Sequence, residues 1–288
     1  MLTKAEFHNL LDRPLLLDGA TGSELQKAGM PRGCCTEQWV LENPEALVCL
    51  QRRYMEAGSN IVYAPTFQAQ PVALAKVGLE KQTESVNEAL VKLSRSAAPG
   101  CLIAGDLTTL AAFMDSWDEG QFDVMVENYR RQIKGLLAGG ADLLAAETLM
   151  YPTEAEAIFT AAELEGAKTV LYTFTMQSDG SLYSGRDAAP ILRELEDSGA
   201  AAVGFNCVAA DNLTAGLVQK LRRSLKGPLV CKPNAGNPVI GMDGLAHYPM
   251  GAEEFGQIVK ECADAGAKLL GGCCGTTPAH IAAIKGVL

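Results

Sequence analysis

The chain has 288 residues, of which 48% are hydrophobic, so it can bury one large core. Its net charge is −10, from 24 Lys and Arg against 34 Asp and Glu, which argues against nucleic acid or an anionic membrane surface as a partner. No apolar run approaches the roughly 20 residues of a membrane helix, and the first residues lack a signal-peptide pattern. We therefore expect a cytoplasmic protein. Nine cysteines, an odd number, argue against a disulfide framework and favour reduced thiols with metal or catalytic functions.

Short apolar runs rich in strand-forming residues alternate along the chain with longer segments of helical periodicity. The runs that predict strands are 15–17, 60–63, 101–104, 142–145, 169–174, 202–205, 228–231 and 268–271. The helical pattern is clearest in 45–57, 124–138, 188–197 and 252–265. Glycines such as Gly58 and Gly199 precede several strands, where a left-handed residue can end the preceding helix. Eight such units predict a single (β/α)₈ TIM barrel, one domain over residues 1–288, with an open doubly wound sheet as the alternative.

Polar residues follow several of the predicted strands. Asp18 and Gly19 follow the first strand, Thr66 the second, Glu147 the fourth and Asn234 the seventh. In a TIM barrel the carboxyl ends of the strands meet at one mouth, where active sites lie. We therefore expect these distant positions to converge on one site.

Three cysteines stand at two further strand ends. Cys207 follows the sixth strand, and Cys273 and Cys274 follow the eighth, between glycines. Two neighbouring thiols alone indicate a metal, a disulfide or a nucleophile. Together with Cys207 they form the soft ligand set that Zn²⁺ favours, and a catalytic zinc keeps its fourth position open for a substrate group such as a thiol. The sequence thus predicts a zinc site with three cysteine ligands.

These motifs, in this order and at this spacing, resemble those of the homocysteine S-methyltransferase family. The segments that carry the resemblance are 18–22, 66–67, 147–148, 204–207, 233–236 and 271–278. The family includes the homocysteine-binding module of cobalamin-dependent methionine synthase, betaine-homocysteine methyltransferase and the S-methylmethionine-dependent enzymes. The resemblance covers almost the whole chain, and its most specific parts are the vicinal cysteines and the Gly-x-Asn-Cys segment. It implies a zinc-dependent barrel that activates the homocysteine thiol and methylates it to methionine.

The resemblance also implies functions for the polar residues at the mouth. Glu147 is expected to bind the homocysteine ammonium, Asp18 and Gly19 to contact the substrate, and Thr66 to donate to its carboxylate. Each has a structural alternative: Glu147 as a solvated acid, Asp18-Gly19 as a turn, and Thr66 as a cap or packing residue. Asn234 either orients the site or stabilises its own loop.

The methyl donor is expected to come from outside the chain, because no segment beyond the barrel remains for a folate or cobalamin domain. The segment 233–236 looks closer to the methionine synthase branch, which favours a methylated corrinoid (cobalamin), free or on a separate protein. S-methylmethionine and betaine are the alternative donors, and another thiol or a selenol is an alternative acceptor. A less favoured alternative is a non-enzymatic zinc-storing or redox-sensing thiol protein.

The remaining cysteines are not expected to bind metal. Cys34 and Cys35 form a second vicinal pair, which we interpret as loop thiols near the mouth, with a redox or lid function as the alternative. The neighbouring pair His247-Tyr248 is expected to border the donor site. The residues expected in the core are Cys49, Cys101, Cys231 and Cys262.

Overall fold

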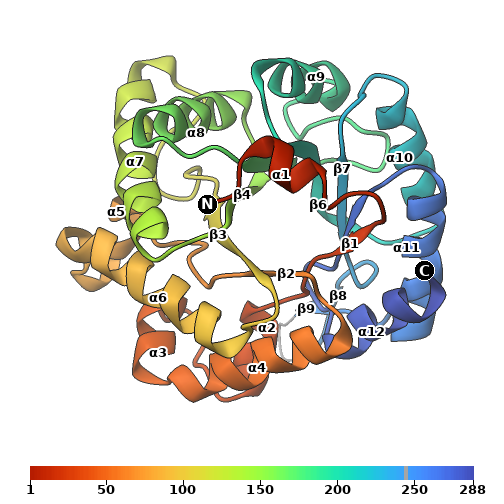
Figure 1. The fold of residues 1–288 in the computed structure, drawn as a ribbon, viewed down its shortest axis with the longest axis horizontal. Helices are drawn as coiled ribbons and strands as arrows, with labels where there is room; N and C mark the ends of the chain where they lie inside the picture. The colour runs from red at the N-terminus through yellow and green to blue at the C-terminus, as the bar shows by residue number, and fades with distance from the viewer. Residues whose placement is uncertain (243–245) are drawn as a thin grey trace.

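The computed structural model describes residues 1–242 and 246–288 and shows a ring of strands surrounded by helices (Figure 1). The ring consists of β1 (Leu15–Leu16), β2 (Ile61–Tyr63), β3 (Leu102–Thr108), β4 (Leu143–Leu149), β5 (Val170–Phe174), β6 (Ala202–Ala209), β7 (Leu229–Asn234) and β10 (Leu269–Leu270). Neighbouring strands pair in parallel in the order β1-β10-β7-β6-β5-β4-β3-β2. Each strand predicted from the sequence is present, so the (β/α)₈ TIM barrel is confirmed.

The ring closes between β1 and β2 through hydrogen bonds that include side chains. The backbone N–H of Asn60 donates to the Leu16 carbonyl at 2.7 Å, and Asn60 Oδ1 accepts from the Leu16 N–H at 2.9 Å. One step toward the carboxyl end, Asp18 Oδ2 accepts from the Tyr63 N–H at 2.8 Å. The Asp18 carboxylate therefore replaces a backbone acceptor at this seam, which fixes its position at the mouth.

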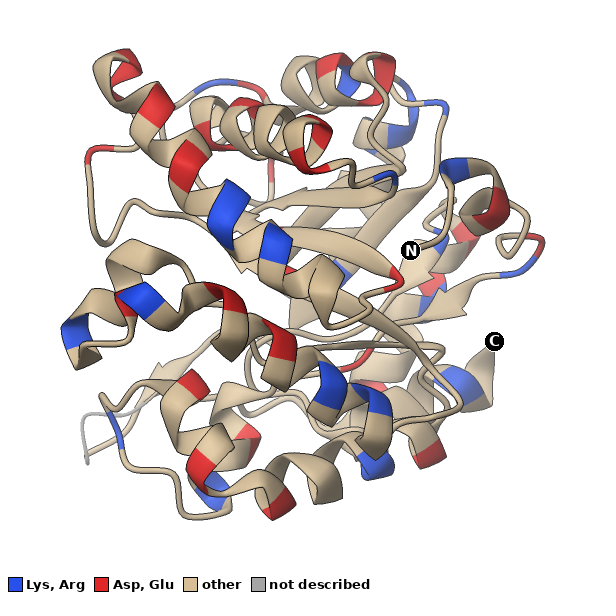
Figure 2. Ribbon diagram, turned by 60° about the vertical axis from the view of Figure 1, so that its left-hand side comes forward, with Lys and Arg blue, Asp and Glu red and all other residues tan. Residues whose placement is uncertain are grey.

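Helices cover the outside of the ring (Figure 1). The longer ones are α4 (Pro44–Ala57), α6 (Thr83–Ala97), α7 (Phe122–Ala138), α8 (Pro152–Glu165), α9 (Ala188–Ser198), α10 (Thr214–Arg222), α11 (Ala252–Asp264) and α12 (Pro278–Val287). Short helices in the connections are α1 (Lys4–His8), α2 (Gly22–Lys27), α3 (Thr36–Glu42) and α5 (Pro71–Leu74), with 3₁₀ turns at 75–77, 80–82 and 119–121. Charged residues of both signs are distributed over these outer helices (Figure 2). None of the helices in the described residues is both long enough and apolar enough to span a membrane.

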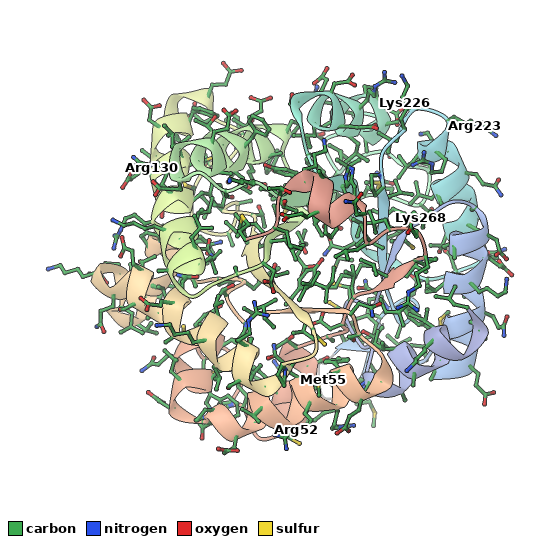
Figure 3. All side chains as sticks on the ribbon, in the orientation of Figure 1. Arg52, Met55, Arg130, Arg223, Lys226 and Lys268 are labelled. Carbon is green, nitrogen blue, oxygen red and sulfur yellow. The ribbon has the colours of Figure 1, made fainter. Side chains whose placement is uncertain are left out.

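The apolar core has two parts, one inside the barrel and one between the strands and the helices. Side chains fill the interior of the ring, while those of Arg52 and Arg130 extend outward from the helices (Figure 3). Phe7 of α1 is fully buried and packs with the inner strand residues. His8 Nε2 lies 2.7 Å from the Ala201 carbonyl, just before β6 begins. Helix α1 therefore closes the amino-terminal end of the barrel, and the carboxyl end is left for the site.

The glycines expected to end helices do so: Gly58 and Gly199 have φ of 113° and 116°. One core assignment was wrong, because Cys49 is exposed on α4, whereas Cys101, Cys231 and Cys262 are buried. An antiparallel hairpin, β8 (Val239–Ile240) with β9 (Ala246–His247), follows β7 and was not predicted. Its two-residue strands are exposed and too short to give a periodic pattern.

Candidate active site

Three cysteine sulfurs meet at the carboxyl-terminal mouth of the barrel. Cys207 lies on β6, and Cys273 and Cys274 lie in the loop after β10. The three Sγ atoms lie within 4.8 Å of one another, and those of Cys207 and Cys274 are 3.7 Å apart. Two sulfurs bound to one tetrahedral Zn²⁺ at about 2.3 Å would lie about 3.8 Å apart. The spacing therefore fits three ligands of one zinc ion, and no other such His, Cys, Asp or Glu group occurs in the described residues.

Asn206 links the sulfur cluster to the end of β4. Cys207 and Thr148 are the two non-glycine residues with positive φ in the described chain, at 57° and 59°. The fully buried Asn206 accepts from the Thr148 N–H at 2.8 Å and donates to Thr148 Oγ1 at 2.7 Å. Its Nδ2 also lies 3.8 Å from Cys273 Sγ. Backbone conformations of this kind persist only when the surroundings hold them, and Asn206 provides such bonds.

The loop with the vicinal cysteines is fixed by its neighbours. The N–H of Cys273 donates to the Pro233 carbonyl at 2.7 Å, and that of Cys274 donates to Asn234 Oδ1 at 3.0 Å. Gly275 has φ of 78°, and a side chain there would collide with Tyr248. Asn234 does not line the cavity described below, and its bond to Cys274 is compatible with both of its predicted functions.

A cavity of about 500 Å³ opens in front of the sulfurs. Its lining includes exposed residues at the rim, among them Gln26, Arg32 and Gln68. Tyr248 lines the cavity beside the cysteines, at the position expected to border a donor. Four buried charged residues at the ends of the strands form what we call the charged floor, which comprises Asp18, Asp106, Glu147 and Lys232. Glu37 of α3 is also buried and lines the cavity, where it accepts from the Gln68 N–H at 2.7 Å.

Lys232 and Glu147 form an ion pair in the charged floor. Lys232 Nζ lies 2.7 Å from Glu147 Oε2, and both side chains are at least nine-tenths buried. The ammonium also lies 4.1 Å from the centre of the Tyr63 ring. Burial alone lowers the pKa of Lys232, but the negative charges of Glu147 and its neighbours outweigh burial and hold this pKa well above its usual value. Glu147, expected to bind a substrate ammonium, thus already contacts an ammonium group of the protein.

Sequence analysis missed Lys232 and Asp106. The predicted strands ended at residues 104 and 231, whereas β3 and β7 extend through Thr108 and Asn234. A charged residue directly after an apolar run, at the mouth of a barrel, was the available signal. Asp106 lies on β3 and is only 5% exposed. It lines the same cavity as Lys232.

The two aspartates of the charged floor are incompletely hydrogen-bonded. Within the described residues, the buried Oδ1 atoms of Asp18 and Asp106 have no hydrogen-bond partner. Burial raises the pKa of Asp18 to about 7. Burial, and then the charge of Glu147, raises the pKa of Asp106 as well. The floor is therefore poor in hydrogen-bond donors for its carboxylates.

Two further predicted site residues hold the framework of the mouth. Thr66 is fully buried, and its hydroxyl donates to the Asp106 carbonyl at 2.9 Å and accepts from the Asp106 N–H at 3.0 Å. It does not line the cavity, so the structure does not place it where it was expected to donate to a substrate carboxylate. Gly19 does line the cavity, and a Cβ there would lie 2.7 Å from Thr276 Oγ1 and 2.8 Å from Tyr54 Oη.

The second vicinal pair stays apart from the sulfur cluster. Cys34 is exposed and donates to the Pro31 carbonyl at 3.0 Å, while Cys35 lies 3.3 Å from Glu37 Oε2. The pair lies in the connection between α2 and α3, and neither thiol belongs to the metal-spaced group.

The fold and the sulfur cluster define a barrel protein with a thiolate site suited to a metal. The chain belongs to the homocysteine S-methyltransferase family, whose model matches residues 15–288. It is 32% identical to a homocysteine S-methyltransferase of Escherichia coli K12, over 96% of both chains. It is 27% identical to a methionine synthase of Mycobacterium leprae, over 94% of this chain and 24% of that protein. The metallated crystal structure of the homocysteine methyltransferase MmuM from E. coli has a TM-score of 0.81 at 28% identity, with 99% of both chains covered.

Proposed function

We propose that this chain methylates the thiol of homocysteine to give methionine, with Zn²⁺ held by Cys207, Cys273 and Cys274. The carrying observation is the sulfur triad with its 3.7 Å contact, open to a cavity that has a charged floor. The metallated form of the E. coli relative supports a metal here. When bound, Zn²⁺ would lower the pKa of a thiol that takes its open position, which makes that thiol a nucleophile near neutral pH.

The residues of the chain would bind and orient the substrate. The homocysteine sulfur would lie at the triad, and its amino-acid end would face the charged floor, where Glu147 and Asp18 provide negative charge and Gly19 leaves room for close approach. Methyl transfer forms a bond from substrate sulfur to the methyl carbon while the bond to the donor breaks. The cavity walls need to hold these two atoms about 3–3.5 Å apart and in line.

The methyl donor is the open part of this proposal. The cavity of about 500 Å³ is within the size range of small-molecule sites and is open at its rim, so it can take homocysteine together with a small sulfonium donor such as S-methylmethionine. A methylated corrinoid, the donor favoured from the sequence, is far larger and would have to react from the mouth. It stays a prediction, as does the cytoplasmic location.

A comparison of donors tests the proposal. The reduced, zinc-loaded protein would be mixed with homocysteine and, in parallel, S-methylmethionine, betaine, methylcobalamin or a methylated corrinoid protein, and methionine would be measured. We expect turnover with S-methylmethionine and none in Cys207→Ser. Turnover with methylated corrinoids alone would restore the donor favoured from the sequence. If no donor gives methionine while the metal is bound, the chain acts on another thiol or selenol, or only stores zinc or senses redox state, and the proposed function is wrong.

A further inference from the structure

The charged floor has more negative than positive charge. Its three carboxylates, on Asp18, Asp106 and Glu147, face one lysine, Lys232, and all four residues are at least nine-tenths buried. Fully ionised, these groups would carry a formal charge of about −2 in a place where unpaired charge is strongly disfavoured. The floor is therefore suited to a cation from outside.

Lys232 forms an ion pair with Glu147 and with neither of the two aspartates. Lys232 Nζ is 2.7 Å from Glu147 Oε2 and rests on the Tyr63 ring. Within the described part of the chain, this leaves the buried Oδ1 atoms of Asp18 and Asp106 without a partner, although both residues line the cavity. These acids are not spaced as ligands of a metal, because the cysteine triad is the one such group among the described residues.

We propose that Asp106 binds the ammonium group of the amino-acid substrate. The inference rests on the proposed function, in which that substrate is homocysteine. A primary ammonium has three N–H donors, and hydrogen bonds between charged groups are the strong ones. A bound ammonium would pair with the carboxyl group of Asp106, which lines the cavity and has no ion pair among the described residues.

The backbone around Asp106 is fixed, which favours a binding function. Its N–H and carbonyl are both bonded to the Thr66 hydroxyl, and Gln132 Nε2 also donates to the carbonyl, at 3.1 Å. These bonds fix the backbone of a residue whose side chain lines the cavity, which lowers the cost of ordering the site around a ligand. The raised pKa of Asp106, caused first by burial, agrees with a carboxylate that lacks a counter-ion when no ligand is bound.

The test compares two thiols that differ in one group. Homocysteine and 4-mercaptobutanoate, which lacks only the amino group, would be titrated into the zinc-loaded protein by calorimetry. We expect the wild type to bind homocysteine more tightly by on the order of 10- to 100-fold, as for hydrogen bonds to charged groups. In Asp106→Asn, the affinity for homocysteine should fall to within a few-fold of that for 4-mercaptobutanoate. The affinity for 4-mercaptobutanoate itself should stay nearly unchanged. Asp106→Ala repeats the test with no side-chain amide.

Thermal unfolding without ligand adds a second measurement. Since burial raises the pKa of Asp106, its ionised form destabilises the fold, so Asp106→Asn should raise the melting temperature most at high pH while it weakens homocysteine binding. The control is Asp142→Asn, because Asp142 lies at the opposite end of the barrel, where it pairs with Arg95 at 2.5 Å. That variant should have a lower melting temperature than the wild type and should prefer homocysteine to 4-mercaptobutanoate by the same factor.

The outcomes separate this inference from the proposed function. If the wild type shows no preference for homocysteine, the proposed substrate is wrong, and the assignment of Asp106 is wrong with it. If the wild type discriminates and Asp106→Asn discriminates equally, only the assignment of Asp106 is overturned. In that case, if Glu147→Gln no longer prefers homocysteine to 4-mercaptobutanoate, Glu147 binds the ammonium despite its pairing with Lys232.

Discussion

Replacement of Lys232 by methionine should strongly destabilise the fold near neutral pH and above. The side chain is the one cation among three buried carboxylates of the charged floor, and it contacts Glu147 at 2.7 Å. Methionine has a similar length and no charge. The variant would therefore leave Glu147 buried without a partner, with its neighbours Asp18 and Asp106 also uncompensated.

The magnitude follows from the burial of the pair. Both side chains are 9% exposed or less, so solvent screens them little. Removal of one partner of such a pair costs about 3–5 kcal/mol of the free energy of unfolding. Glu147→Gln should cost less, because the lysine keeps the two aspartates as neighbours. The double variant Lys232→Met/Glu147→Gln should recover most of the loss, since both charges of the pair are gone.

Urea unfolding of the four proteins at pH 8, in one metal state, measures these differences. Arg95→Met is the control, because its pair with Asp142 is partly exposed, and we expect a loss of at most about 1 kcal/mol. At pH 5 the loss in Lys232→Met should shrink, because burial raises the pKa of Asp18 to about 7 and the carboxyls can take up protons. A loss below about 1 kcal/mol at pH 8, or no recovery in the double variant, would refute the reasoning.

Three further predictions follow from other parts of the site. Cys207→Ser should lose most of its zinc, so metal analysis should fall well below one ion per chain; full occupancy would contradict the triad. The pKa of Asp18 is raised from 3.8 to about 7, so the folded state binds the proton more tightly, and stability should fall by up to about 4 kcal/mol as the pH rises through this range. Asp18→Asn should flatten that dependence in urea unfolding, and an unchanged slope would assign the effect to other groups. Gly19→Ala should cost about 1–3 kcal/mol because its Cβ would lie 2.7 Å from Thr276 Oγ1, whereas Gly22→Ala, with nothing within 4 Å, should be nearly neutral in the same assay.

The barrel was predictable because its strands are buried on both faces along their amino-terminal halves. β1 and β10 have two residues each, yet the leucines around them gave a clear apolar run. The periodicity of α4 and α7 was equally clear, and both helices begin within two residues of their predicted starts. These features depend on local sequence and on burial, which is why one chain was enough to find them.

The carboxyl ends of the strands were less predictable, for a physical reason. β3 and β7 continue for three or more residues past the point where the apolar run stops, and β4 extends to Leu149. Among those last residues, Asp106, Glu147, Thr148 and Lys232 are polar and line the cavity, so the apolar pattern that identifies a strand is interrupted where the site begins. Asp106 and Lys232 lie in these extensions. The pairing of Lys232 with Glu147 also joins strands that are not neighbours in the sheet, which no local pattern can show.

The thiol end and the acid end of the cavity belong to one rigid unit. Asn206 precedes Cys207 and is hydrogen-bonded to Thr148, which directly follows Glu147. Both Cys207 and Thr148 have positive φ, a conformation that persists where the surroundings hold it, and the Asn206 side chain supplies such bonds at Thr148. A shift of the sulfur ligand would therefore move the carboxylate that pairs with Lys232. Because the same asparagine fixes both ends, the distance between the thiol site and the charged floor is set by the fold, which is what recognition of one short amino acid with a terminal thiol requires.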